Sequence, residues 1–145
     1  MAHSPEVRLL DDLGFLLTRA GGLVVGSVNK ALAPLGLKVR PYSVLVLACE
    51  NAAGVNQRAV AATLGLDPSQ VVALVDDLER RGLVERIADH ADRRNKLIVA
   101  TAAGRAVLGE ARGLVDEVHS RCFGQLPEQV LDDMREALRG LVAER

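Results

Sequence analysis

Two adjacent arginines, Arg93 and Arg94, stand in a short charged segment beside Asp89 and Asp92. An arginine on an exposed loop can enter a narrow DNA minor groove, where the negative potential is enhanced. A neighbouring carboxylate would hold such an arginine extended. Residues 88–95 contain no large apolar side chain, so the segment also fits a solvated charged turn. The spacing alone leaves both interpretations open.

A second candidate site lies on a helix expected over residues 68–81. Its apolar residues recur at helical spacing and predict one buried face, formed by Val71, Leu74, Val75 and Leu78. The residues on or beside the outward face are candidates for contacts with DNA bases: Ser69, Gln70, Val72, Ala73 and Arg80. Serine and glutamine donate and accept hydrogen bonds at base edges, and small apolar side chains suit a thymine methyl group.

Two carboxylates on that helix, Asp76 and Asp77, are unfavourable for DNA binding because they repel phosphates. Such a group is useful if it accepts a hydrogen bond from a cytosine amino group. It is also tolerated if it pairs with an arginine, and Arg80 follows Asp76 by four residues. The remaining interpretation is that both are solvated surface residues.

Strong capping signals surround these candidates. Asn56 is the expected N-cap of a helix over residues 57–64, and with Gln57 it stands where helix N-termini hold phosphates. Gly65 suits the left-handed end of that helix. The run Asp67-Pro68-Ser69-Gln70 resembles a capping box that starts the next one. Two short helices joined by a glycine-containing turn are typical of a helix-turn-helix.

A hairpin is expected to follow. Residues 83–87 and 96–100 are short and rich in β-branched side chains, which predicts two strands, and residues 88–95 form an exposed tip ending at Asn95. A lone hairpin is only marginally stable, so it should pack on the preceding helices. The candidate DNA contacts on this wing are Asp92, Arg93, Arg94 and Asn95. A helix-turn-helix with such a hairpin is a winged helix.

Long helices flank the winged helix. The first is expected from Pro5 to Ala33, capped by Ser4 and ended by Pro34 and Gly36. The remaining helices are expected over residues 41–50, from residue 101 to a break at 126–127, and beyond that break. The terminal helices carry more apolar surface than a small winged helix covers, which predicts a homodimer. The expected fold is mainly α with a two- or three-stranded wing: dimerisation residues 1–37 and 105–145 around a DNA-binding region of residues 38–104.

Composition narrows the function further. The net charge is −1, yet residues 38–105 hold ten basic and eight acidic side chains, so the mildly positive part coincides with the winged helix. The sequence shows no Ser-His-Asp set, glycine-rich phosphate loop or metal-ligand spacing, so we expect no enzyme, cofactor or metal site. It also has no apolar run of 18 residues and no signal-peptide pattern, which favours a cytoplasmic protein bound to the nucleoid through DNA.

The run Asp67–Arg86, followed by Asp92-Arg93-Arg94 and by Leu97–Gly104, resembles the MarR family of bacterial transcriptional regulators. The resemblance covers the winged helix closely, and the six-helix layout extends it over most of the chain. It implies a homodimer, usually a repressor, bound to a pseudo-palindromic operator. It also implies that Arg94 enters the minor groove with Asp92 as its positioning partner. Many members release DNA when a small phenolic or lipophilic effector binds.

The sequence departs from that family in two ways. Family members often carry basic residues where this chain has Ala73 and Asp77. A winged-helix module that binds proteins and has weak or lost DNA binding is therefore the alternative function. Oxidant-sensing members keep a cysteine near the start of the first helix, which this chain lacks. Cys49 and Cys122 are expected to serve packing, with a free interface thiol as the alternative for Cys122.

Overall fold

The computed structural model describes residues 8–143. Helices dominate, and the strands are few and short, as the sequence predicts. The elements follow one another in this order: η1 (Leu9–Asp11), α1 (Leu13–Leu32), η2 (Ala33–Leu35), α2 (Val39–Glu50), β1 (Val55–Asn56), α3 (Gln57–Leu64), α4 (Pro68–Arg80), β2 (Val84–Ala88), β3 (Lys96–Ala100), α5 (Ala102–Phe123) and α6 (Glu128–Ala143).

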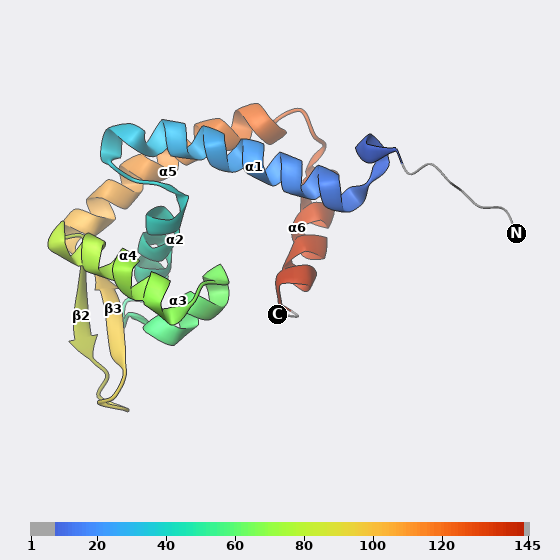
Figure 1. Cartoon of the computed structure of the whole chain (residues 1–145). Helices are drawn as coiled ribbons and strands as arrows, with labels where there is room; N and C mark the ends of the chain where they lie inside the picture. Colours follow the sequence, from blue (N-terminus) through green and yellow to red (C-terminus); the bar gives the residue numbers. More distant parts are fainter. Residues whose placement is uncertain (1–7, 144–145) are drawn as a thin grey trace, which may run out of the picture.

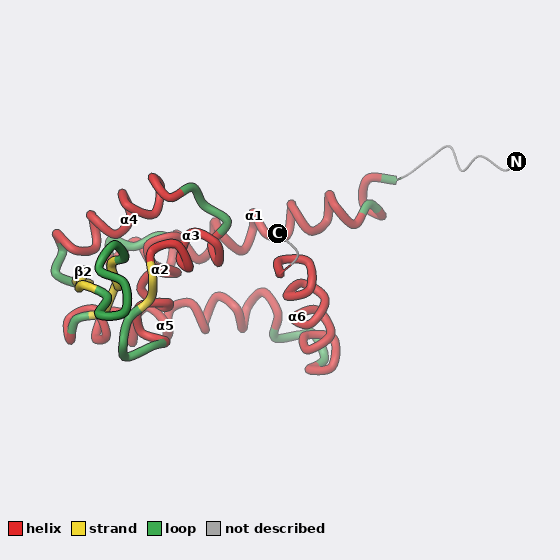
Figure 2. Tube along the Cα trace, turned by 90° about the horizontal axis from the view of Figure 1, so that it is seen from below, coloured by secondary structure: helices red, strands yellow, loops and turns green. Residues whose placement is uncertain are grey.

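The helices form an elongated layer with a compact body at one end. The long helices α1 and α5 run beside each other, and α2, α3, α4 and the strands lie below one end of this pair (Figure 1). Helix α6 turns away at the other end, and Figure 2 shows the same separation from below. The core lies in the compact body, where Leu32, Leu45, Leu78 and Ile98 are fully buried.

The wing is a three-stranded antiparallel sheet in the order β1-β3-β2. Strand β2 pairs with β3 from Val84 opposite Ala100 to Ala88 opposite Lys96, so the expected hairpin is confirmed. The short β1 adds Val55 opposite Ile98 on the other side. A strand of two residues is too short to show the alternation of apolar and polar side chains, so the sequence predicts a wing of two or three strands without deciding between them.

The helix-turn-helix forms where the capping residues predict it. The side-chain oxygen Oδ1 of Asn56 accepts a hydrogen bond from the Arg58 amide at 2.7 Å and starts α3. Gly65 ends α3 in the left-handed conformation, with φ 65°. At the start of α4, Oε1 of Gln70 accepts from the Asp67 amide at 3.0 Å, which is one half of the capping box.

The first long helix begins later than expected. The apolar pattern predicts a helix from Pro5, but α1 starts at Leu13 and is preceded by the 3₁₀ turn η1. The physical reason is Asp12, whose side chain accepts from the Phe15 amide at 2.8 Å and caps the helix there. The expected cap at Ser4 and Pro5 lies outside the described residues.

The wing is bound tightly to the start of α5. Thr101 caps α5 by accepting from the Gly104 amide at 3.0 Å, and its hydroxyl donates to the Gly82 carbonyl at 2.6 Å. Gly104 lies against the backbone of Leu83, which occupies the space that a Cβ atom would need. The spacing of Thr101 and Gly104 therefore has a packing cause, namely the close approach of α5 to the residue that precedes β2.

This close approach predicts that Gly104→Ala destabilises the fold by about 1–3 kcal/mol, because the added methyl group forces the backbone of Leu83 to move. Gly113→Ala in the same helix is the matched control, since a Cβ there meets nothing within 4 Å. That control should be neutral or stabilising by up to about 1 kcal/mol. Urea unfolding at one fixed protein concentration measures both, and equal effects of the two substitutions would contradict this packing.

Arg81 joins the end of α4 to the corner between α1 and α2. Its guanidinium donates to the Gly36 carbonyl at 3.0 Å and to the Leu35 carbonyl at 2.8 Å. At the same corner, Oδ1 of Asn29 accepts from the Val39 amide at 2.8 Å, which ties α1 to the first turn of α2. Helix α4, which carries the candidate base contacts, is thus bonded to the corner between α1 and α2.

Two apolar faces at the far end of the molecule are exposed within the described residues. None of the residues of α6 is buried within the described chain. The exposed large apolar side chains on the N-terminal part and on the C-terminal part are Leu9, Leu10, Leu13, Leu16 and Leu17, and Leu126, Val130, Met134, Leu138, Leu141 and Val142. Apolar faces of this extent are typical of an interface, and they match the surfaces expected to form a homodimer.

A helix that spans a membrane needs about 20 mostly apolar residues. No single helix within residues 8–143 is long and apolar enough to cross a bilayer. One bent pair, residues 13–35 with residues 39–50 at an angle of 75°, meets the criteria for length and composition together.

Candidate nucleic-acid interface

Helix α4 presents the outward face that the sequence predicts. Val71, Val75 and Leu78 are fully buried and hold the helix against the core. Ser69, Gln70 and Ala73 are exposed, and Val72 is 38% exposed although it is apolar. An apolar side chain left in solvent on the outer face of a capped helix is suited to contact with a nucleic-acid base edge.

A hollow of about 400 Å³ joins three elements beside this face. It brings together the starts of α3 and α4 and the C-terminal end of the wing loop, and its lining residues are Asn56, Gln57, Arg58, Pro68, Arg94, Asn95 and Lys96. Four of these are expected DNA contacts that are far apart in the sequence. Arg58, Arg94 and Lys96 give the hollow three cations, and its lining contains no carboxylate. Such a concave basic site is complementary to a phosphate.

Sequence reasoning missed Arg58 and Lys96. Each directly follows a predicted contact, Arg58 after Gln57 and Lys96 after Asn95. The signal was their positive charge next to a helix start and a strand start, but only the fold shows that the two positions converge.

The acceptor atoms of Asn56 and Gln57 are already used inside the protein. Oδ1 of Asn56 caps α3, and Oε1 of Gln57 accepts from Nε of Arg86 at 3.2 Å. The amide nitrogens take no part in these two bonds. Donation by an amide nitrogen is also what a phosphate requires, so the arrangement remains compatible with the predicted role.

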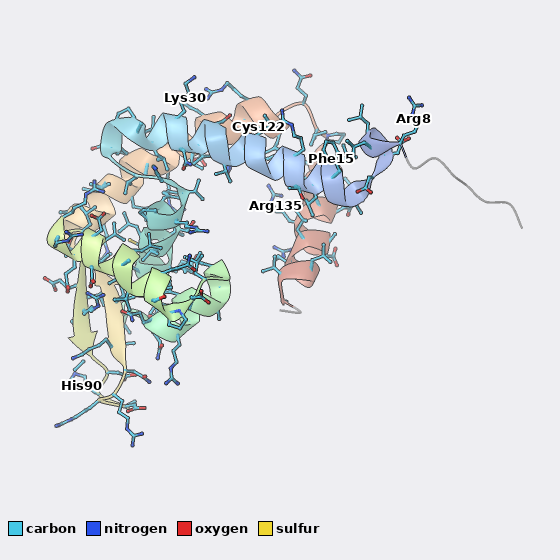
Figure 3. All side chains as sticks on the ribbon, in the orientation of Figure 1. Arg8, Phe15, Lys30, His90, Cys122 and Arg135 are labelled. Carbon is cyan, nitrogen blue, oxygen red and sulfur yellow. The ribbon has the colours of Figure 1, made fainter. Side chains whose placement is uncertain are left out.

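Asp92 shapes the wing tip through the backbone. Its Oδ1 accepts from the Arg94 amide at 3.1 Å, and its carbonyl accepts from the Asn95 amide at 3.0 Å. The expectation was that this carboxylate would hold the Arg94 guanidinium extended; in the structure it fixes the Arg94 main chain instead. Arg93 and Arg94 are both exposed, and His90 lies at the far tip of the wing (Figure 3).

The carboxylates on α4 have partners other than the one expected. Asp76 pairs with Arg86 of β2 at 2.7 Å, whereas the sequence suggested Arg80. Arg80 instead forms a loose ion pair with Asp77 at 3.5 Å, and its Nε donates to the Asp76 carbonyl at 3.4 Å. The reason is the packing of β2 on α4, which brings Arg86 across the helix. The Asp77–Arg80 pair is largely exposed and contributes little to stability.

A smaller hollow of about 320 Å³ lies between α2, α3 and α5, lined by Tyr42, Ser43, Val46, Leu47, Thr63, Leu64 and Arg112. Burial raises the pKa of the Tyr42 phenol above its usual value, so the hydroxyl remains protonated and can donate at neutral pH. This mostly apolar hollow has the chemistry of a site for a small lipophilic molecule. The sequence alone did not identify Tyr42 or Arg112 as a site residue.

The two cysteines differ in burial. Cys49 is half-buried against the core, and burial raises the pKa of its thiol, which reduces the reactive thiolate at neutral pH. Cys122 is exposed near the end of α5, so the described residues do not provide the packing expected for it. Among the described residues, no group of three His, Cys, Asp or Glu side chains could hold a metal ion.

The elements described above define a winged helix with long flanking helices, the architecture of a class of DNA-binding transcriptional regulators. A family model for the MarR family matches residues 35–95. The HTH-type transcriptional repressor Rv2887 of Mycobacterium tuberculosis is 31% identical over 125 residues, covering 83% of this chain and 89% of that protein. The chain belongs to the MarR family of transcriptional regulators, which are not enzymes.

Two solved structures are similar over nearly the whole length. CouR from Rhodococcus jostii RHA1, bound to p-coumaroyl-CoA, is 59% identical with a TM-score of 0.91, covering 94% of this chain and 96% of that one. A transcriptional repressor CouR bound to a 23-mer DNA duplex is 35% identical with a TM-score of 0.77, covering 96% and 97%. The expected winged-helix fold and DNA-binding regulatory function are confirmed by these comparisons.

Proposed function

We propose that the chain is a dimeric repressor whose two winged helices bind a pseudo-palindromic operator. The observation that carries this proposal is the basic hollow, because it gathers cations from α3 and from the wing beside the outer face of α4. A bound duplex would then meet one continuous surface on each subunit. The DNA complex of the 35% identical CouR repressor supports the same use of the fold.

Each candidate residue has a distinct role on that surface. Ser69, Gln70, Val72 and Ala73 face base edges in the major groove. The residues that hold phosphates are Asn56, Gln57, Arg58, Arg80 and Lys96, which fix the position of the protein without reading sequence. Arg94 enters the minor groove, with Arg93 beside it and Asp92 and Asn95 shaping the turn that carries both.

The subunits join through the two apolar faces at the far end of the molecule. Residues 1–37 and 105–145 form the dimerisation part, and residues 38–104 form the DNA-binding part. Helix α6 supports this division, since none of its apolar residues is buried within the described chain. A protein of this kind works in the cytoplasm and is associated with the nucleoid through its DNA contacts.

The effector is an aromatic acyl-CoA thioester. The CouR structure at 59% identity contains p-coumaroyl-CoA, and the hollow at Tyr42 has room for one aromatic acyl group, at about 320 Å³. Tyr42 and Arg112 supply polar groups in an otherwise mostly apolar lining. The coenzyme A part is too large for this hollow and would remain outside it. Binding beside α2 and α5 would change the position of the winged helix and release the operator.

A titration of the purified protein against DNA from upstream of its own gene tests this function. Operator binding should weaken roughly a thousandfold between 50 and 200 mM salt, because a dimer that neutralises about six to ten phosphates releases the counterions they had condensed. A scrambled fragment of the same length and composition is the control. Equal binding to both fragments at both salt concentrations would contradict sequence-specific recognition.

The same titration with p-coumaroyl-CoA tests the effector. Saturating thioester should weaken operator binding by about tenfold or more, which is within the usual range of coupling between two ligands. Free coenzyme A at the same concentration is the control for the part that the hollow does not hold. An unchanged operator affinity in the presence of p-coumaroyl-CoA would remove this effector from the proposal without affecting DNA binding.

A further inference from the structure

Arg86 is the most connected side chain near the DNA-binding face. Its guanidinium bonds Asp76 at 2.7 Å, Glu79 at 2.9 Å, Oε1 of Gln57 at 3.2 Å and the Val72 carbonyl at 3.3 Å. Its own amide also donates to Glu79 at 3.0 Å. The residue stands on β2, and its partners stand on α3 and α4. One side chain therefore joins the wing to both helices of the helix-turn-helix.

The Arg86 guanidinium is turned toward its protein partners. The Arg86 side chain is 19% exposed, whereas the side chains of Asp76 and Glu79 are 53% and 42% exposed. All three nitrogens of its planar group, Nε, Nη1 and Nη2, bond protein atoms. With each of its three nitrogens bonded to a protein atom, Arg86 has most of its donor capacity used within the protein, so we expect it to act on DNA through its neighbours.

Those neighbours explain how an acidic helix can face DNA. Helix α4 carries Asp76, Asp77 and Glu79 but only Arg80 as a cation. Arg86 supplies a second positive charge from outside the helix, and it holds two of the three carboxylates against β2. Without this charge, the part of α4 that follows the base-reading residues would repel the phosphate backbone.

We propose that Arg86 is a positioning residue for operator binding: it neutralises Asp76 and Glu79, and thereby makes the acidic face of α4 compatible with DNA. The role rests on the proposed DNA-binding function. It requires Arg86 to matter only because the carboxylates are present. That requirement separates it from a general structural role, in which loss of Arg86 would be harmful whether or not its partners carried charge.

The test measures operator affinity for four proteins: the unmodified chain, Arg86→Gln, the double variant Asp76→Asn/Glu79→Gln, and the triple variant that combines all three substitutions. The probe is the upstream DNA fragment, with the scrambled fragment as reference. Lys30→Gln removes the same charge from an exposed position on α1, away from the wing, and controls for net charge (Figure 3). Circular dichroism and melting temperatures monitor folding.

Arg86→Gln should weaken operator binding by about tenfold or more, because two unpaired carboxylates then face the phosphates. The triple variant should bind within about threefold of the double variant, since neutral partners no longer need Arg86. If Arg86→Gln does not fold, the comparison of the triple with the double variant decides alone.

Two results would overturn the proposal. The first is an Arg86→Gln affinity within about twofold of the unmodified chain. The second is a triple variant that falls about tenfold or more below the double variant, because Arg86 would then act independently of the two carboxylates. Failure of the unmodified chain to prefer the upstream fragment would instead reject the DNA-binding function itself, and the role of Arg86 with it.

Discussion

Arg94→Ala should weaken operator binding by about 1–3 kcal/mol for each wing, and a dimer carries two wings. The guanidinium stands on an exposed turn that Asp92 fixes through the backbone, so its loss removes a minor-groove contact and leaves the turn intact. Fluorescence anisotropy with a labelled operator fragment measures the loss. The melting temperature should stay within about a degree of the unmodified protein, because exposed side chains contribute little to stability.

Lys30→Ala is the matched control for this prediction, because it removes one positive charge from an exposed position on α1. It should change operator affinity by less than about 0.5 kcal/mol, since charges beyond a Debye length are largely screened. An Arg94→Ala protein that binds as tightly as the Lys30→Ala protein would reject the assignment of Arg94 to the minor groove. A large drop in melting temperature would instead assign Arg94 to the fold.

The second large effect concerns the dimer. Leu13→Asp combined with Leu141→Asp should raise the dissociation constant of the dimer by at least about a thousandfold, since each buried unpaired carboxylate costs several kcal/mol. Leu13 and Leu141 are 79% and 57% exposed in the single chain, so the substitutions should leave the subunit folded. Sedimentation at micromolar concentration should show a monomer, and operator binding should fall with it.

A matched control places the same charge on the other side of α6. At about 100° per residue, Gly140 falls on the polar face of α6. A Cβ atom there meets nothing within 4 Å, so Gly140→Asp adds the charge without a clash. This variant should sediment as the dimer. If the double leucine variant also remains a dimer, the apolar faces of α1 and α6 are not the subunit interface.

Local signals in the sequence predicted the winged helix well. The start of α3 at Asn56, the capping box at Asp67 and the two paired strands each depend on residues within a few positions of one another. Such signals act over one turn of a helix or along one strand, so no knowledge of distant packing is needed. Where two local signals competed, the result was harder to predict. The apolar pattern extends back through η1, but the Asp12 cap starts α1 only at Leu13.

The candidate site was less predictable because its key contacts are distant in sequence. Arg86 reaches Gln57, 29 residues away, and Val72, 14 residues away. An i,i+4 rule within α4 suggested Arg80 as the partner of Asp76, but a strand outside the helix provides it. Arg58 and Lys96 became site residues only when the fold placed α3 beside the wing. Charge in a sequence gives the candidates, and tertiary packing decides their partners.

The bonds from Arg81 to the Leu35 and Gly36 carbonyls have a consequence for the operator itself. They hold α4 against the α1–α2 corner, while Arg86 holds it to the wing, so we expect α4, that corner and the wing to move together as one unit. In a dimer bound to its operator, the two α4 helices would contact the two half-sites at one distance and one angle about the DNA axis. Each base pair inserted between half-sites rotates one of them by about 35° about the DNA axis. We therefore expect operator affinity to fall when base pairs are inserted between the half-sites, and an effector that moves this unit would change the spacing that the dimer fits.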